Sequence, residues 1–303
     1  AGPARGGTRR RVRRNRAVPL LLGPFLVLFA AFFVAPIGYA IYQSLLTVER
    51  SGPLGLGGEQ QVFAGLDNYA AALADEQFVA SLGRVLLFGV VQVPLMILLS
   101  VVLALLLESL SVRGVRFWRT AYFLPHGFPG VIASILWGFL YVPGISPIVA
   151  GLHGAGIEVD FLSRETVLWS IANIVTWQYA GYNMLVLIAQ LKAVPNDLYE
   201  AAKVDGANAW HVVRHVKLPM LRPAIVLTTV FTIIGTLQLF SEPLVLRPLT
   251  ANVNDTYTPN LTAYTEAFVN NGYNLAAAEA VLLAGTACVL SFGFLRLVGR
   301  RGE

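Results

Sequence analysis

Six stretches of about 20 or more mainly apolar residues recur along this chain of 303 residues. A helix needs about 20 such residues to cross the hydrocarbon core of a bilayer. The stretches cover residues 17–46, 82–107, 122–142, 167–191, 221–243 and 275–298. The pattern therefore predicts an all-α membrane protein with six transmembrane helices.

Basic residues are distributed unevenly between these stretches. Residues 1–16, 108–120, 192–222 and 296–303 hold 18 of the 22 Lys and Arg residues. These four segments all fall on one side of the membrane if the six stretches cross it in turn. Because Lys and Arg collect in cytoplasmic loops, both the N-terminus and the C-terminus are expected in the cytoplasm.

The first sixteen residues contain seven Arg and no acidic residue. Such a run is typical either of a nucleic-acid-binding arm or of a cytoplasmic tail that fixes membrane topology. The apolar stretch that follows at once favours the tail, and no nucleic-acid partner is expected. We therefore expect a basic, largely disordered cytoplasmic tail at 1–16 and one transmembrane domain at 17–303.

The composition agrees with a membrane domain and excludes several kinds of chemistry. Apolar residues make up 56% of the chain and charged residues 13%, against about 25% charged in soluble domains. The single cysteine, Cys288, excludes an internal disulfide framework and a multi-cysteine metal site. No HExxH zinc helix and no GK phosphate loop occurs. The chain is therefore expected to be no enzyme, to bind no cofactor or metal, and to leave any ATP hydrolysis to a separate subunit.

The inner segment 192–219 is polar and predicts two short helices. Pro195 suits the first turn of a helix, and Gly206 is expected to end that helix. Leu198, Ala201, Ala202 and Asp205 have i, i+3, i+4, i+7 spacing and so share one narrow face. Pro219 is expected to stop the second helix. The spacing alone fits either a docking helix for a partner or an interfacial helix that lies on the membrane.

The same segment carries a recognisable motif. Glu200-Ala201-Ala202 is followed by three residues, Gly206, nine residues, and Val216-x-Leu218-Pro219. This resembles the EAA loop, EAA-x3-G-x9-I-x-LP, of permease subunits of bacterial ABC importers, with Val in place of Ile. The stretches 63–69 and 123–125 are similar to the carbohydrate branch, the maltose-type first permease. The resemblance covers about residues 18–300.

The resemblance implies a type I ABC importer permease fold in a bacterial inner membrane. It implies a second permease subunit in a heterodimer, two ATPase subunits that bind ATP and Mg, and an external solute-binding protein that delivers a sugar. In that family the EAA loop is the coupling helix that contacts the ATPase. The residues expected to make this contact are Glu200, Ala201, Ala202, Asp205 and Gly206.

Polar residues inside membrane spans are costly and are therefore candidates for a solute path. Span four offers Asn173, Trp177, Gly181, Tyr182 and Asn183, and span five offers Gln238, Ser241 and Glu242. Aromatic rings and amides suit the faces and hydroxyls of a sugar. The alternative roles are helix–helix contacts and, for the aromatic residues, an interfacial belt.

The charge of these spans bears on the solute. Spans three to six hold no Lys or Arg away from their ends. A binding site for a phosphate ester would be expected to contain such a residue. This favours a neutral sugar over glycerol 3-phosphate. An ion-coupled secondary carrier is a further alternative, but only Glu279 lies well inside a span, and such carriers usually need several ionisable groups there.

Overall fold

The computed structural model describes residues 17–50, 58–108 and 113–299, and the predicted tail at 1–16 lies outside these residues. The N-terminal part contains α1 (Ala17–Phe29), a π-helical segment η1 (Ala30–Val34) and α2 (Ala35–Ser44). These are followed by strands β1 (Leu46–Arg50) and β2 (Glu59–Phe63) and helix α3 (Asp67–Ala74). The rest is helical: α4 (Glu76–Glu108), α5 (Val115–Phe123), 3-10 helix η3 (Leu124–Gly127), α6 (Gly130–Tyr141), α7 (Pro147–Gly154), α8 (Val167–Lys192), α9 (Asn196–Val204), α10 (Ala209–Val212), π-helix η4 (Val213–Lys217), α11 (Leu218–Leu237), α12 (Ser241–Leu246), 3-10 helix η5 (Arg247–Leu249), α13 (Pro259–Phe268) and α14 (Tyr273–Gly299).

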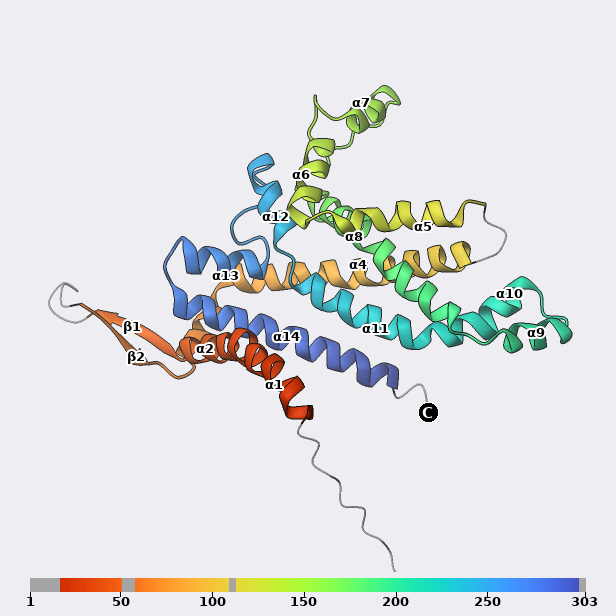
Figure 1. Ribbon diagram of the computed structural model, residues 1–303. Coiled ribbons are helices and arrows are strands. Elements are labelled where there is room, and N and C mark those ends of the chain that lie inside the picture. Colours follow the sequence, from red (N-terminus) through yellow and green to blue (C-terminus); the bar gives the residue numbers. More distant parts are fainter. Residues whose placement is uncertain (1–16, 51–57, 109–112, 300–303) are drawn as a thin grey trace, which may run out of the picture.

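Four long helices form the centre of the molecule (Figure 1). α4 packs against both α8 and α11, and α11 in turn packs against α8 and α14. Between α4, α8 and α11, the side chains of Ile97, Met184, Leu187 and Leu221 are almost completely buried. This contact fixes the relative positions of α8 and α11, whose polar residues were predicted to form the solute path.

A β-hairpin corrects the all-α expectation. β1 and β2 pair antiparallel, with Leu46 opposite Phe63 and Arg50 opposite Glu59. The hairpin projects from one end of the bundle, beyond α2 (Figure 1). The β-branched residues Thr47 and Val48 favour an extended strand directly after the predicted first span, which ended at Leu46.

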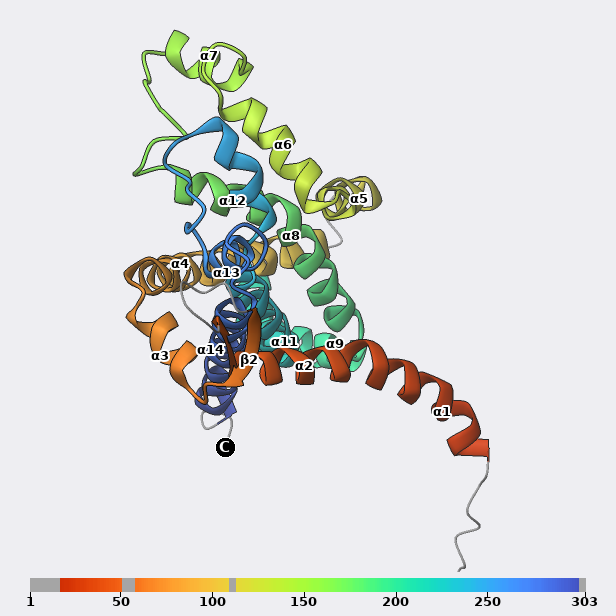
Figure 2. The same ribbon diagram turned by 90° about the vertical axis from the view of Figure 1, so that its left-hand side faces the viewer.

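The first helix leaves the bundle. α2 packs on α14, whereas α1 extends sideways away from the other helices (Figure 2). No residue in the apolar window of Leu21–Ser44 is buried against the rest of the chain. An apolar helix without protein contacts needs lipid or another subunit around it.

The third predicted span is not one straight helix. α5 with η3 and the following α6 meet at a bend of 100°. Pro125 and Pro129 supply no backbone N–H at this point, and Phe128 is extended at φ −85° and ψ 134°. The side-chain amide of Gln178 donates to the Phe128 carbonyl at 2.7 Å, so the broken backbone is satisfied from α8.

By length and apolar composition alone, six spans are not confirmed. Among the described residues, four helical segments are long and apolar enough to cross a membrane, or five if the bent pair counts as one span. They are Leu21–Ser44, Glu76–Glu108, Ala209–Leu249 and Tyr273–Gly299. α8 is 26 residues long but falls outside this set because amides and hydroxyls lower its hydropathy.

Candidate functional site

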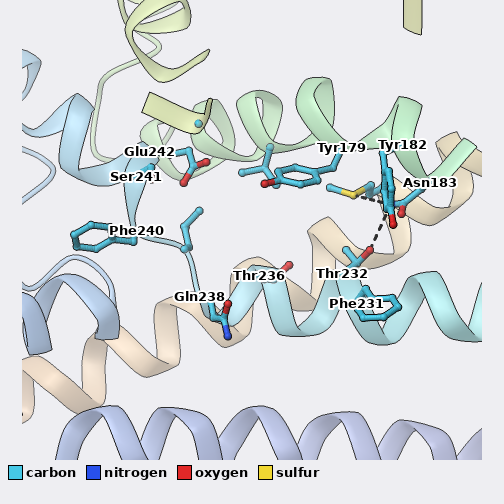
Figure 3. A pocket seen from close by; sticks show the side chains of 15 residues that line it. Tyr179, Tyr182, Asn183, Phe231, Thr232, Thr236, Gln238, Phe240, Ser241 and Glu242 are labelled. Carbon is cyan, nitrogen blue, oxygen red and sulfur yellow. Dashed lines mark hydrogen bonds between the residues drawn. The ribbon is translucent and has the colours of Figure 1, made fainter. Parts of the chain in front are cut away.

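A cavity of about 410 Å³ lies between α8, α11 and the start of α12. Figure 3 shows side chains of α8 on one side, those of α11 on the other, and Ser241 and Glu242 towards one end. Its size is within the usual range for small-molecule sites. The lining residues are Met96, Gly130, Val175, Tyr179, Tyr182, Asn183, Phe231, Thr232, Gly235, Thr236, Gln238, Leu239, Phe240, Ser241 and Glu242.

The end of α11 creates the most polar part of this cavity. α11 ends at Leu237, and α12 does not begin until Ser241. Pro243 falls in the first turn of α12, where its missing N–H leaves no helical bond unmade. The break places Gln238, Ser241 and Glu242 beside the cavity. Glu242 is 7% exposed, so its carboxyl group is shielded from bulk solvent.

α8 contributes an aromatic and amide surface. The ring of Tyr182 stacks on His126 with centroids 4.7 Å apart. The Asn183 amide donates to the Met96 sulfur at 3.3 Å and to the Thr232 hydroxyl at 3.4 Å. These contacts fix the two side chains at the cavity wall. The site thus presents ring faces together with amide and hydroxyl groups, which suits a hydroxylated solute.

None of the described residues that line the cavity is Lys, Arg or His. Glu242 is its one charged lining residue. An anionic solute would meet a carboxylate here without a compensating cation, which is unfavourable in a shielded site.

Three predicted path residues lie away from the cavity. The Asn173 amide donates to the Tyr141 hydroxyl at 2.9 Å. Trp177 packs between the rings of Phe128 and Trp137, at centroid distances of 6.2 and 5.8 Å. These contacts are made to α6 and the bend before it, so this face of α8 holds helices together.

Gly181, on the same face, provides the closest helix contact. A Cβ atom at this position would lie 1.8 Å from the Tyr122 carbonyl oxygen of α5. Only glycine allows the two backbones to approach so closely. The predicted face Asn173, Trp177 and Gly181 therefore packs against α5 and α6, whereas Tyr182, Asn183, Gln238, Ser241 and Glu242 line the cavity.

Several lining residues were missed from the sequence. Val175 and Tyr179 were not predicted; together with the predicted Tyr182 they follow i, i+4, i+7 spacing and define the face of α8 that borders the cavity. On α11, Thr232 and Thr236 are one turn apart on the facing side. This spacing was visible in the sequence, but the amides on the other face of α8 gave an equally strong polar pattern.

The predicted coupling segment forms two short helices with defined ends. Gly206 has φ +74°. The Ala207 N–H donates to the Ala202 carbonyl at 2.9 Å and the Gly206 N–H to the Lys203 carbonyl at 3.0 Å. These bonds form a Schellman motif, which confirms that Gly206 ends the first helix. The Asn208 side chain then caps α10 by accepting from the His211 N–H.

A groove of about 480 Å³ lies between α9 and the α10–η4 segment. Of the predicted contact residues, Ala201, Ala202, Asp205 and Gly206 line it, and Glu200 is exposed on α9 beside it. The other lining residues are Leu198, Ala207, His211, His215 and Val216. Small side chains on one wall leave this groove open to a partner.

Pro219 does not stop the second helix, contrary to expectation. α10, η4 and α11 run on without a break, and the π-helical turn η4 lies immediately before the proline. A π turn shifts the hydrogen-bond register and so accommodates the missing N–H. The segment is therefore continuous with the helix that lines the cavity.

A salt bridge between Lys217 and Glu108 ties η4 to the end of α4. The Lys217 ammonium group also lies 5.9 Å from the Tyr199 ring centroid. Burial, and secondarily the Glu108 carboxylate, raise the pKa of the Tyr199 hydroxyl. These contacts link η4 to the end of α4 and to Tyr199 of α9.

Long apolar helices around a polar cavity are typical of a membrane transport protein. The chain belongs to the family described as binding-protein-dependent transport system inner membrane component, which matches residues 70–302. It is therefore a transport permease subunit and not an enzyme.

Curated relatives match along nearly the whole chain. The trehalose transport permease SugA of Mycobacterium tuberculosis is 31% identical over 95% of this chain and 91% of its own length. The lactose permease LacF of Rhizobium radiobacter is 31% identical over 90% and 91%. The sn-glycerol-3-phosphate permease UgpA of Agrobacterium fabrum is 30% identical over 95% and 96%.

Solved structures share the fold. A chain of a bacterial ABC transporter involved in alginate import superposes with a TM-score of 0.81 at 22% identity, covering 96% of this chain and 98% of that chain. A chain of the MetNI methionine transporter gives 0.53 at 16% identity, covering 74% and 95%. The type I ABC permease fold is therefore confirmed.

Proposed function

We propose that this chain forms half of the membrane path of an ATP-driven importer for a neutral sugar or oligosaccharide. The observation that carries this proposal is the cavity between α8, α11 and α12, which combines Tyr179 and Tyr182 with amide and hydroxyl groups. Relatives named for trehalose and lactose support a sugar.

The charge of the cavity favours a neutral solute over glycerol 3-phosphate. One relative is named for that ester, so glycerol 3-phosphate is the alternative solute. Phosphate is usually held by Arg or Lys, whereas the described lining residues offer only the Glu242 carboxylate. Neutral hydroxyls, in contrast, donate readily to a carboxylate.

The proposal assigns coupling to α9 and α10. A separate ATPase, which binds the ATP and Mg, would dock at the groove and contact Glu200, Ala201, Ala202, Asp205 and Gly206. The segment lies at the end of the bundle where α14 ends, opposite the β-hairpin (Figure 1). In this arrangement six helices cross the membrane, both termini are cytoplasmic, and an external solute-binding protein delivers the sugar on the hairpin side.

The path would be completed by a second, different permease subunit. The apolar first helix, unburied within this chain, and the exposed side chains Ile132, Leu136 and Phe139 of α6 offer surfaces for it.

ATP-dependent uptake by the complete complex, purified with its partners and reconstituted in vesicles, tests the proposal. We expect uptake of radiolabelled trehalose or lactose that depends on ATP and on the binding protein. Glu242→Lys should abolish it, while Glu242→Gln, which keeps size and hydrogen bonding, should retain part of it. Uptake of glycerol 3-phosphate alone would overturn the sugar assignment, and uptake without ATP would overturn the importer.

A further inference from the structure

His211 and His215 stand one turn apart on the wall of the groove between α9 and α10. Their rings are stacked, with centroids 5.9 Å apart and an interplanar angle of 15°. Both side chains are exposed, and both line the groove. Two histidines with i, i+4 spacing on one helical face are an arrangement that binds a metal ion between them.

The hydrogen bonds of the two rings fix their tautomers. Nδ1 of His211 lies 2.8 Å from Oδ1 of Asn208, and Nδ1 of His215 lies 3.2 Å from the His211 carbonyl oxygen. Both partner atoms are acceptors only, so each Nδ1 must carry the proton. In the neutral rings the Nε2 lone pairs are then left for another ligand.

This pattern is the usual support of a metal-binding histidine. Such a histidine donates its second ring N–H to a carbonyl or carboxylate oxygen, which orients the ring. Asn208 is itself held in place, because the same Oδ1 accepts the backbone N–H of His211 at 2.9 Å. The cap of α10 therefore fixes the orientation of the His211 ring without a metal.

The donor set decides the kind of metal. Imidazole nitrogens suit zinc, copper and nickel, whereas Mg²⁺ and Ca²⁺ prefer oxygen. Within the described part of the chain no three His, Cys, Asp or Glu residues are grouped to hold a metal ion. The protein would supply two ligands and water the others, with the Asp205 carboxylate bordering the same groove.

We propose that His211 and His215 bind one divalent transition-metal ion, with Zn²⁺ as its representative, on the coupling segment. Binding of the ion rests only on these residues. A consequence rests on the proposed function: an ion in the groove would occupy the surface assigned to the ATPase and would inhibit transport.

The test uses the full chain with its second permease subunit but without the ATPase, which is proposed to cover the groove, purified through an affinity tag that contains no histidine. Titration with ZnCl₂ against a fluorescent zinc chelator should show one saturable site per permease chain. His211→Ala and His215→Ala should each abolish it, whereas His153→Ala, an exposed single histidine on α7, should leave it unchanged. Equal binding by wild type and both groove variants would overturn the proposal.

Cu²⁺ gives a signature that non-specific binding lacks. Its electron paramagnetic resonance spectrum should show coupling to two imidazole nitrogens in wild type and to fewer in either groove variant. A spectrum without two-nitrogen coupling in wild type would contradict the paired site. Asn208→Ala should weaken the affinity by about tenfold, the usual effect of removing a partner of a metal-binding histidine.

Inhibition is measured separately. Zn²⁺ should lower solute-stimulated ATP hydrolysis by the wild-type complex, reversibly on adding EDTA, and should have no effect on the His215→Ala complex. If the ion binds with the expected stoichiometry but hydrolysis is unchanged, the metal site stands and the assignment of this groove to the ATPase is contradicted.

Discussion

At the scale of single residues, Gly206 has a backbone conformation that other residues adopt only at a cost. Its φ is +74°, and a Cβ atom there would meet nothing within 4 Å, so the cost is conformational and not steric. It amounts to about 1–2 kcal/mol for an L-residue. We expect Gly206→Ala to destabilise the α9–α10 segment, measured as faster amide hydrogen exchange in residues 196–217.

Gly154 provides a matched control for this prediction. It lies at the end of α7 without a positive φ, and a Cβ atom added there would meet nothing within 4 Å. Gly154→Ala should be neutral or stabilising by about 0.4–1 kcal/mol, because it restricts only the unfolded chain. Equal effects of the two substitutions on their own segments would contradict the requirement at Gly206.

Gly181 is constrained by space. A Cβ atom would lie 1.8 Å from the carbonyl oxygen and 2.4 Å from the carbonyl carbon of Tyr122, so α5 would have to move. Overpacking of this kind costs about 1–3 kcal/mol. Gly181→Ala should lower the SDS concentration at which the purified chain unfolds. Gly285→Ala in α14, where nothing lies within 4 Å, should not.

At the scale of elements, the bend between α5 and α6 depends on one side chain of α8. Gln178 is 3% exposed and donates to the Phe128 carbonyl. Gln178→Leu would remove this hydrogen bond, at a cost of about 0.5–1.5 kcal/mol. We expect a corresponding loss of stability in SDS unfolding. Gln190→Leu removes a longer, exposed hydrogen bond to the Met220 carbonyl from the same helix and should cost less; a loss as large would show that the bend is not the cause.

The same bend shows which elements the sequence could predict. Long apolar stretches identified α4 and α14, and Gly206 marked the end of α9, because these signals are local. The bend at Phe128 could not be predicted, since the group that satisfies it comes from 50 residues further along the chain. The prediction that Pro219 ends the helix was wrong for a similar reason. The π turn before Pro219 shifts the hydrogen-bond register and so accommodates the missing N–H.

The candidate site was predicted only in part. Gln238, Ser241 and Glu242 were chosen as polar residues on one face of a continuous fifth span, and they border the cavity although α11 ends before them. For α8 the polar residues surround the helix, which is packed by α4 on one side and by α5 and α6 on others. Periodicity could not tell its packing face, Asn173 to Gly181, from its cavity face.

At the scale of the whole molecule, the chain has two different ends. The β-hairpin lies at one end, and α9, α10 and the end of α14 lie at the other (Figure 1). Among the described residues, 192–222 and the last turn of α14 bring six basic residues to that second end. The proposed coupling requires it to face the cytoplasm, where an ATPase and its nucleotide are available.

Accessibility of single cysteines tests this orientation. Cys288 is the one cysteine of the chain, so Cys288→Ser gives a clean background for Gln60→Cys in the exposed hairpin and Val204→Cys, at a position 88% exposed, in α9. In spheroplasts a membrane-impermeant maleimide should label position 60 and not position 204. Inside-out vesicles should give the reverse, because the same two sites then exchange compartments. Labelling of position 204 from outside would show that the grooved segment faces the exterior, where no ATP is available. That result would contradict both the coupling role of α9 and import along this path.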